Sequence, residues 1–206
     1  NNTIKAYDSI KQALDIYVTE GNIISIMSCY ERFAEVYFML DNYTDALTYL
    51  EMSLNIANKL NNLYFVEHLN SLIAWTYYRE KKYDLTLKYL NYNTGLVDQR
   101  KIIPDSIIES LVYFTTENKD MLRISIEKIK NADSVVQLGD DLANMIYKLF
   151  NYYLEEEKYI KSNIWEALLI YIIDGLHNFV ELKKVFTLLL KDYYIQNRRY
   201  KDALFL

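Results

Sequence analysis

A chain of 206 residues that is 51% hydrophobic and 25% charged can bury a core and is too mixed in composition to be disordered. Its 4 glycines and 1 proline do not suffice for the tight turns of a sandwich, a barrel or a phosphate-binding loop, so helices with short connections are predicted. The net charge of −5, with no concentration of lysine and arginine, argues against direct nucleic-acid contact. One cysteine, and no apolar run of the roughly 18 to 20 residues that cross a bilayer, predict a soluble, cytoplasmic protein.

The first predicted helices belong to a repeat. Ala6, Ile10 and Ala13 match the second helix of a pair whose first helix is missing, so we expect the chain to begin within a repeat. The two clearest copies, 36–50 (VYFMLDNYTDALTYL) and 76–90 (TYYREKKYDLTLKYL), are offset by 40 residues. The offset aligns Ala34 with Ala74, Tyr37 with Tyr77, Tyr43 with Tyr83, Leu47 with Leu87, Tyr49 with Tyr89 and Leu50 with Leu90.

Weaker copies continue along the chain. Residues 113–132 and 150–169 are degenerate copies, with Leu122 and Tyr159 in the place of the turn aromatic, and YKDAL at 200–204 echoes YTDAL at 43–47. Between 142 and 154, apolar residues recur at i, i+3, i+4, i+7 and i+8, the stripe of a buried helix face. Helix starts are predicted at Asp41–Asn42, at Pro104–Asp105 and at 139–141. We therefore predict about five helical hairpins, stacked in a single domain over residues 1–206.

The first copy resembles the tetratricopeptide repeat (TPR), in which small and aromatic residues recur along two antiparallel helices. Ala34, Tyr37, Tyr43, Ala46, Leu50 and Ser53 occupy the positions of that pattern. The small residues let the two helices approach closely, and the tyrosines wedge the hairpin at its turn. The second copy departs from the pattern at Thr86 and Asn93, where looser packing is expected. The resemblance implies an all-α fold, a right-handed α-α superhelix (solenoid) of TPR-like hairpins.

Catalytic and metal-binding patterns have no support in the sequence. His68 and His177 are the only histidines, and neither has a second His or Cys at metal-ligand spacing. Cys29 has no neighbouring histidine and is predicted to be a buried thiol rather than a nucleophile. Asp140 and Asp141 are interpreted as a helix cap rather than a catalytic carboxylate pair. We therefore predict no enzyme activity, no metal and no cofactor.

In tetratricopeptide proteins the first helix of each hairpin lines a concave, peptide-binding groove, and the resemblance implies groove positions in four hairpins. They are Ser28, Glu31, Glu35 and Phe38; His68, Ser71, Trp75, Tyr78 and Arg79; Ser110, Phe114 and Glu117; and, opposite the apolar stripe, Asn144, Tyr147, Lys148, Asn151 and Glu155. Asparagine amides could clamp a peptide backbone, although a solvated helix face fits that last set equally well. Trp75 and Tyr78 also fit packing against the neighbouring repeat. Because acidic residues outnumber basic ones here, a peptide with a free amino terminus or Lys or Arg side chains is expected.

Repeats near 40 residues, longer than the usual roughly 34 and rich in Asn, Tyr and Ile, resemble the cytoplasmic peptide-pheromone receptors of Gram-positive bacteria and their phages, the group called RRNPP. This resemblance implies a sensor domain of a transcription regulator that binds a short signalling peptide in quorum sensing. It also implies DNA contact only through an N-terminal helix-turn-helix domain outside this segment, a possible homodimer, and no membrane contact. Asn151→Ala would then weaken peptide binding without unfolding. The alternative is a constitutive protein–protein interaction scaffold without a signalling peptide; a catalytic domain with an unrecognised site is the third hypothesis.

Overall fold

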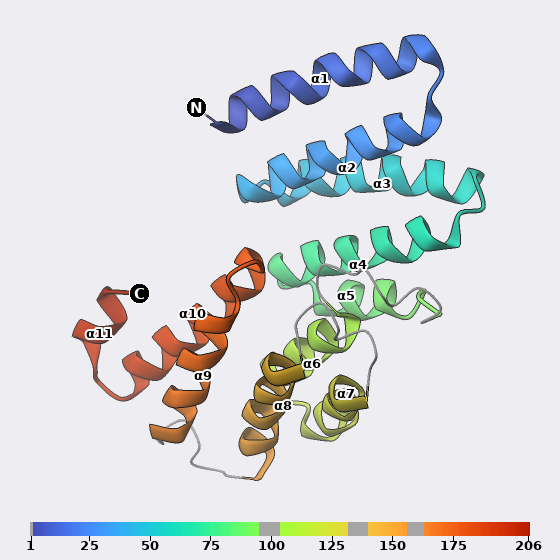
Figure 1. Ribbon diagram of the computed structural model, residues 1–206. Helices are drawn as coiled ribbons and strands as arrows, with labels where there is room; N and C mark the ends of the chain where they lie inside the picture. The colour runs from blue at the N-terminus through green and yellow to red at the C-terminus, as the bar shows by residue number, and fades with distance from the viewer. Residues whose placement is uncertain (1, 95–103, 132–139, 156–162) are drawn as a thin grey trace. The chain divides into compact units, whose positions relative to one another are not determined.

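The computed structural model describes residues 2–94, 104–131, 140–155 and 163–206. Eleven helices and no strand are found in these residues, 84% of which are helical (Figure 1), which confirms the all-α prediction. The helices group into two compact units, Asn1–Val97 with α1 to α5 and Asp98–Leu206 with α6 to α11. Within each unit, a helix packs against the helices that precede and follow it in the sequence. One continuous repeat domain over residues 1–206 stays a prediction.

Unit 1 repeats one helix and one turn every 20 residues. Its helices are α1 (Asn2–Glu20), α2 (Ile23–Met39), α3 (Tyr43–Lys59), α4 (Leu63–Arg79) and α5 (Tyr83–Leu90). Each turn contains one residue with a left-handed backbone, at Gly21, Asp41, Asn61 and Lys81, with φ values of 67°, 55°, 50° and 61°. Only glycine adopts this conformation without a steric cost, yet three of the four positions carry other residues.

The turn between α2 and α3 shows how the reversal is held. The N–H of Asn42 donates to the carbonyl of Tyr37 at 2.9 Å, and the N–H of Asp41 donates to that of Phe38 at 3.0 Å. This Schellman pattern satisfies the last carbonyls of α2. Asn42 then caps α3, because its Oδ1 accepts from the N–H of Asp45 at 3.3 Å. The same residue therefore ends one helix and starts the next, and Asn22 and Asn62 cap α2 and α4 in the same way.

Ring contacts recur across the 40-residue offset of unit 1. The ring centroids lie 5.5 Å apart in both Tyr37–Tyr49 and Tyr77–Tyr89, and 5.3 and 5.9 Å apart in Phe38–Tyr43 and Tyr78–Tyr83. Ala34 and Ala46 are buried where the helices meet, as predicted. The core around them contains Met27, Leu47, Leu50, Ala57, Leu69 and Ile73. These contacts confirm the 40-residue repeat within residues 34–90.

The second copy differs from the first where the sequence departed from the repeat pattern. Helix α5 ends at Leu90, whereas α3 continues for 17 residues. The Asn93 side chain donates to Ser71 Oγ at 3.0 Å and accepts from the Asn70 amide at 3.2 Å. The N–H of Thr94 donates to the carboxylate of buried Glu67 at 2.9 Å. Asn93 and Thr94, which follow the end of α5, thus hydrogen-bond to polar groups buried on α4.

Unit 2 contains α6 (Asp105–Thr115), α7 (Lys119–Asn131), α8 (Asp140–Glu155), α9 (Asn163–Gly175), α10 (Val180–Gln196) and α11 (Tyr200–Leu204). The predicted apolar stripe of α8 is confirmed, since Leu142, Ile146, Leu149, Phe150 and Tyr153 are buried. Phe114, expected in the groove, packs on the Phe150 and Tyr153 rings at 5.6 and 4.8 Å. Ser110 is buried against Ser125 Oγ at 2.8 Å. Tyr159 lies outside the described residues.

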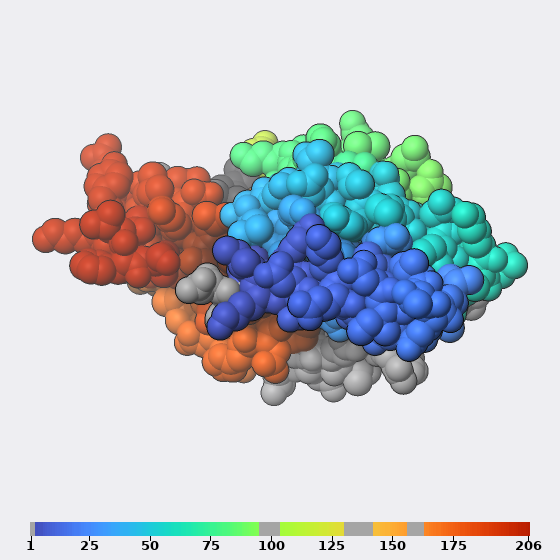
Figure 2. All heavy atoms as spheres, turned by 90° about the horizontal axis from the view of Figure 1, so that it is seen from above, coloured from blue at the N-terminus to red at the C-terminus, as the bar shows by residue number. Residues whose placement is uncertain are grey.

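None of the described helices combines the length and apolar character that a membrane crossing needs. Helix α1, in dark blue, presents one long side outwards in Figure 2. Ile4, Ile16 and Val18 of this helix are 66%, 56% and 58% exposed, respectively. These apolar side chains are interspersed with exposed charged residues such as Lys11 and Asp15.

Candidate functional site

The structure brings together most of the groove residues predicted in the first two repeats. Glu31, Glu35 and Phe38 lie on α2, and His68, Trp75, Tyr78 and Arg79 lie on α4; we call this set the α2/α4 surface. His68 Nε2 lies 2.9 Å from Glu31 Oε1, which joins the two helices near their middle. The Arg79 guanidinium lies 5.7 Å from the centre of the Phe38 ring and 3.6 Å from Asp41 Oδ1. Helices α2 and α4, the first helices of two successive helix pairs, are thus in direct contact.

Acidic side chains dominate the exposed part of the α2/α4 surface. Arg32 Nη1 donates to both carboxylate oxygens of Glu35, at 2.9 and 2.7 Å. The hydrogen bond and the charge of Glu35 raise the pKa of Arg32 above its usual value, so the guanidinium is a permanent cation. This pair is exposed, with side-chain accessibilities of 65% for Arg32 and 38% for Glu35, and exposed ion pairs are weak in water. A cationic ligand can therefore compete with Arg32 for Glu35 at little energetic cost.

Two of the predicted groove residues on α4 are buried. The Ser71 hydroxyl donates to the carbonyl of Glu67 at 3.0 Å and accepts from Asn93, so it belongs to the polar network of unit 1. Trp75 is 5% exposed and stacks on Tyr78 with ring centroids 5.3 Å apart, which matches the core-packing interpretation of both residues. The Trp75 indole N–H is buried and has no hydrogen-bond acceptor in the described part of the chain. Ser71 and Trp75 are thus covered in this structure, whereas Glu31 and Glu35 are partly open.

The remaining predicted residues lie on α8 of unit 2. Asn144, Lys148 and Glu155 are exposed, and Tyr147 and Asn151 are half-buried. The Asn151 amide donates to Glu155 Oε1 at 2.7 Å, one turn along the helix. The Tyr147 hydroxyl donates to Glu127 Oε1 of α7 at 3.1 Å, and burial, together with that bond, raises the pKa of Tyr147. The Asn144 amide is exposed, as expected. The half-buried Asn151 amide is hydrogen-bonded to the exposed side chain of Glu155.

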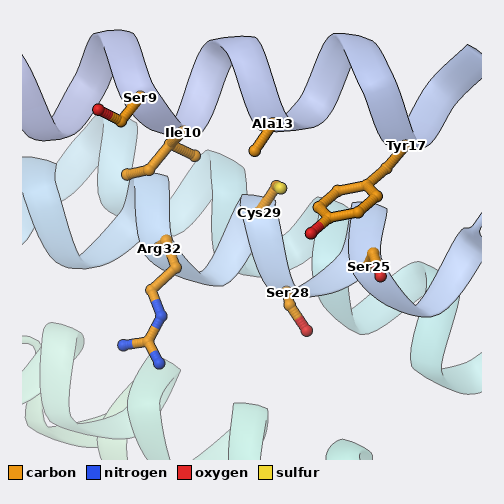
Figure 3. A pocket seen from close by; sticks show the side chains of 8 residues that line it. All are labelled: Ser9, Ile10, Ala13, Tyr17, Ser25, Ser28, Cys29 and Arg32. Atoms are coloured by element: carbon orange, nitrogen blue, oxygen red, sulfur yellow. The ribbon is translucent and has the colours of Figure 1, made fainter.

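A hollow that the sequence analysis missed lies between α1 and α2 (Figure 3). Its volume is about 330 Å³, and eight side chains line it: Ser9, Ile10, Ala13, Tyr17, Ser25, Ser28, Cys29 and Arg32. Five of these side chains are small. A comparison of the faces that α1 and α2 turn toward each other could have revealed that their side chains are too small to fill the space between them. Cys29 is buried at its floor, and burial raises the pKa of its thiol, so the protonated form is favoured.

No cluster of three or more metal-binding side chains occurs in the described ranges of the chain. His177 is exposed, and His68 is paired with Glu31. No protein-family model matches the chain, and neither the curated proteins nor the solved structures contain a match.

Proposed function

We propose that the chain is a TPR-like peptide-binding domain, and that the α2/α4 surface holds an extended peptide or protein segment that contains lysine or arginine. The observation that carries this proposal is the contact of Glu31 with His68, which places the first helices of two successive helix pairs side by side. Helix pairs that repeat every 40 residues stack into a right-handed superhelix when each pair packs on the next in the same way. Such an array leaves the first helices along one side, where an extended segment can lie across them.

Charge selects the kind of segment. Glu31 and Glu35 point their carboxylates into this surface, and Arg32 is the exposed cation that balances one of them. A lysine or arginine of the ligand would take the place of Arg32 beside Glu35, and the displaced guanidinium, which is already largely exposed, would be hydrated by solvent. The asparagine-rich face of α8, with Asn144 and Asn151, offers amides for the backbone of a ligand.

A selection experiment tests the proposal. A random heptapeptide library is displayed on phage and selected on the immobilised protein, and enriched peptides are measured by titration calorimetry. We expect enriched peptides to contain Lys or Arg. Combining Glu31→Gln with Glu35→Gln should weaken their binding about 3- to 10-fold, because each lost contact is a partly exposed charge pair. Glu51→Gln, on the exposed side of α3, is the control and should change nothing. No enrichment over a blank surface, or full affinity in the double variant, would overturn the proposal.

The finer proposal is that this binding domain is the sensor of a cytoplasmic transcription regulator and responds to a short signalling peptide. It rests on the resemblance of the long, Asn- and Tyr-rich repeats to the RRNPP receptors. A sensor must differ in shape between its free and bound states, because a ligand shifts only an equilibrium whose two states it binds differently. Small-angle scattering at saturating selected peptide should therefore show a changed radius of gyration. An unchanged radius with a bound peptide favours the scaffold instead.

A constitutive interaction scaffold is the second candidate, and one observation favours it. Ile4, Ile16 and Val18 of α1 are exposed, and exposed apolar side chains of this size can pack against a protein partner. Replacing all three by serine should abolish capture of a partner protein by the scaffold, while a peptide sensor would keep its affinity for the selected peptide.

A further inference from the structure

The hollow between α1 and α2 has an apolar floor and a polar rim. Ile10 and Ala13 of α1 and Cys29 of α2 project into the gap between the two helices, and the Tyr17 ring closes one end (Figure 3). Ser28 and Arg32 project from α2 away from α1 in the same view. An apolar group that entered the hollow would therefore meet carbon and sulfur atoms at the bottom and hydroxyl groups at the edge.

The hollow is a built feature of the contact between α1 and α2. Tyr7 fixes one end of α1, because its ring lies 5.0 Å from that of Phe33 and 6.2 Å from that of Tyr37. Further along the same contact, the side chains that face each other are those of Ala13, Cys29 and their small neighbours. Aromatic rings fill the contact at one place, and small side chains leave an open volume at the other.

The hollow is linked to the α2/α4 surface by the Arg32–Glu35 ion pair. Arg32 lines the hollow, and its guanidinium binds Glu35 at 2.7 Å. Glu31 lies on the same helix and contacts His68 of α4. A segment that reaches Glu35 with a cationic side chain is therefore within a few residues of the hollow along α2.

We propose that the hollow is an anchor pocket for one aliphatic side chain, of the size of leucine, isoleucine or methionine, belonging to the segment that binds the α2/α4 surface. The inference rests on the proposed function and specifies its ligand: an aliphatic residue close to a lysine or arginine. A volume of about 330 Å³ is large enough to admit a whole aliphatic side chain. Burial of such a side chain strengthens binding by roughly tenfold or more.

Filling the hollow tests the pocket. Ala13→Leu places an isobutyl group in it, and because Ala13 is only half-buried beside open volume, the variant should keep the urea midpoint of the wild type. Ala6→Leu makes the same change at an exposed position of the same helix and serves as the control. The probe is the tightest heptapeptide from the display selection, with each apolar position changed to glycine in turn. We expect one of the glycine changes to lower the affinity of the peptide for the wild type and for Ala6→Leu about tenfold. The Ala13→Leu protein should bind the original peptide more weakly than the wild type does, and the same glycine change should not lower that affinity further.

Cys29 supplies an independent readout, because it is the only cysteine and lies at the floor of the hollow. Alkylation by N-ethylmaleimide, followed by mass spectrometry, should slow severalfold when the selected peptide is bound, and should not slow with the peptide that carries glycine at the anchor position. Equal affinity of Ala13→Leu and wild type for the peptide, or equal alkylation rates with both peptides, would refute the pocket while leaving the proposed function intact. A wild-type protein that enriches no peptide refutes the proposed function itself.

Discussion

Two opposite substitutions test the left-handed turns of unit 1. Gly21 and Lys81 occupy the same place in two turns, with φ of 67° and 61°, and both are exposed. A Cβ added to Gly21 would meet no atom within 4 Å, so the backbone angle is the only source of strain. A left-handed backbone costs an L-residue roughly 1–2 kcal/mol, and glycine loses roughly 0.5–1 kcal/mol more than alanine on folding through conformational entropy. The difference between these terms is about 0.5–1 kcal/mol.

Gly21→Ala should therefore lower the free energy of unfolding by about 0.5–1 kcal/mol, and Lys81→Gly should raise it by a similar amount. Lys88→Gly, at an exposed position inside α5, is the matched control and should lower it by about 1 kcal/mol because glycine is a poor helix former. Urea denaturation followed by circular dichroism at 222 nm measures all three. A neutral Gly21→Ala variant, or a Lys81→Gly variant less stable than wild type, would refute the left-handed turn at these positions.

Two other predictions concern a half-buried tyrosine and an ion-pair cluster. Burial, with a smaller contribution from Tyr7, raises the pKa of Tyr37 to about 12, whereas an unfolded tyrosine titrates near about 10. The raised pKa of Tyr37 contributes to stability below about pH 10, and this contribution is lost as the pH rises from about 10 to about 12. The urea midpoint of the wild type should therefore fall over that interval, and the fall should be smaller in Tyr37→Phe. Arg199 lies 2.6 Å from both Glu166 and Asp202 and ties α11 to α9. Arg199→Gln should speed hydrogen exchange in α11 about threefold or more, because it removes the ion pair with Glu166 that holds the start of α11 to α9, while Arg198→Gln should not.

The repeat could be predicted from sequence because its two copies carry the same side chains at the same contacts. Tyr37 and Tyr49 stack in one copy, Tyr77 and Tyr89 in the next, and both alignments are visible in the letters alone. The 20-residue spacing of the turns was equally visible in Asn22, Asn42 and Asn62. It was missed because a left-handed turn is usually sought at glycine, and this chain uses Asp, Asn and Lys there.

Contacts between residues distant in sequence could not be predicted in this way. Asn93 binds Ser71, 22 residues earlier, just after α5 ends at Leu90, and no local sequence pattern indicates that partner. The hollow between α1 and α2 has the same origin. Ala13 and Cys29 are unremarkable in their own helices, and open volume arises only because these two small residues face each other.

The contacts of Arg79 bear on the charge expected of the ligand. The repeat register places its cation in the groove, where it would offset the acidic residues. The structure instead holds the guanidinium 5.7 Å from each of the Phe38 and Tyr43 rings and within 3.6 Å of Asp41, with the Arg79 side chain 16% exposed. Because this charge stabilises the contact between α2 and α4, it contributes little to the potential over Glu31 and Glu35. The preference for a cationic ligand should accordingly be stronger than the count of charged residues suggests, and binding of a lysine-containing peptide should weaken with rising salt.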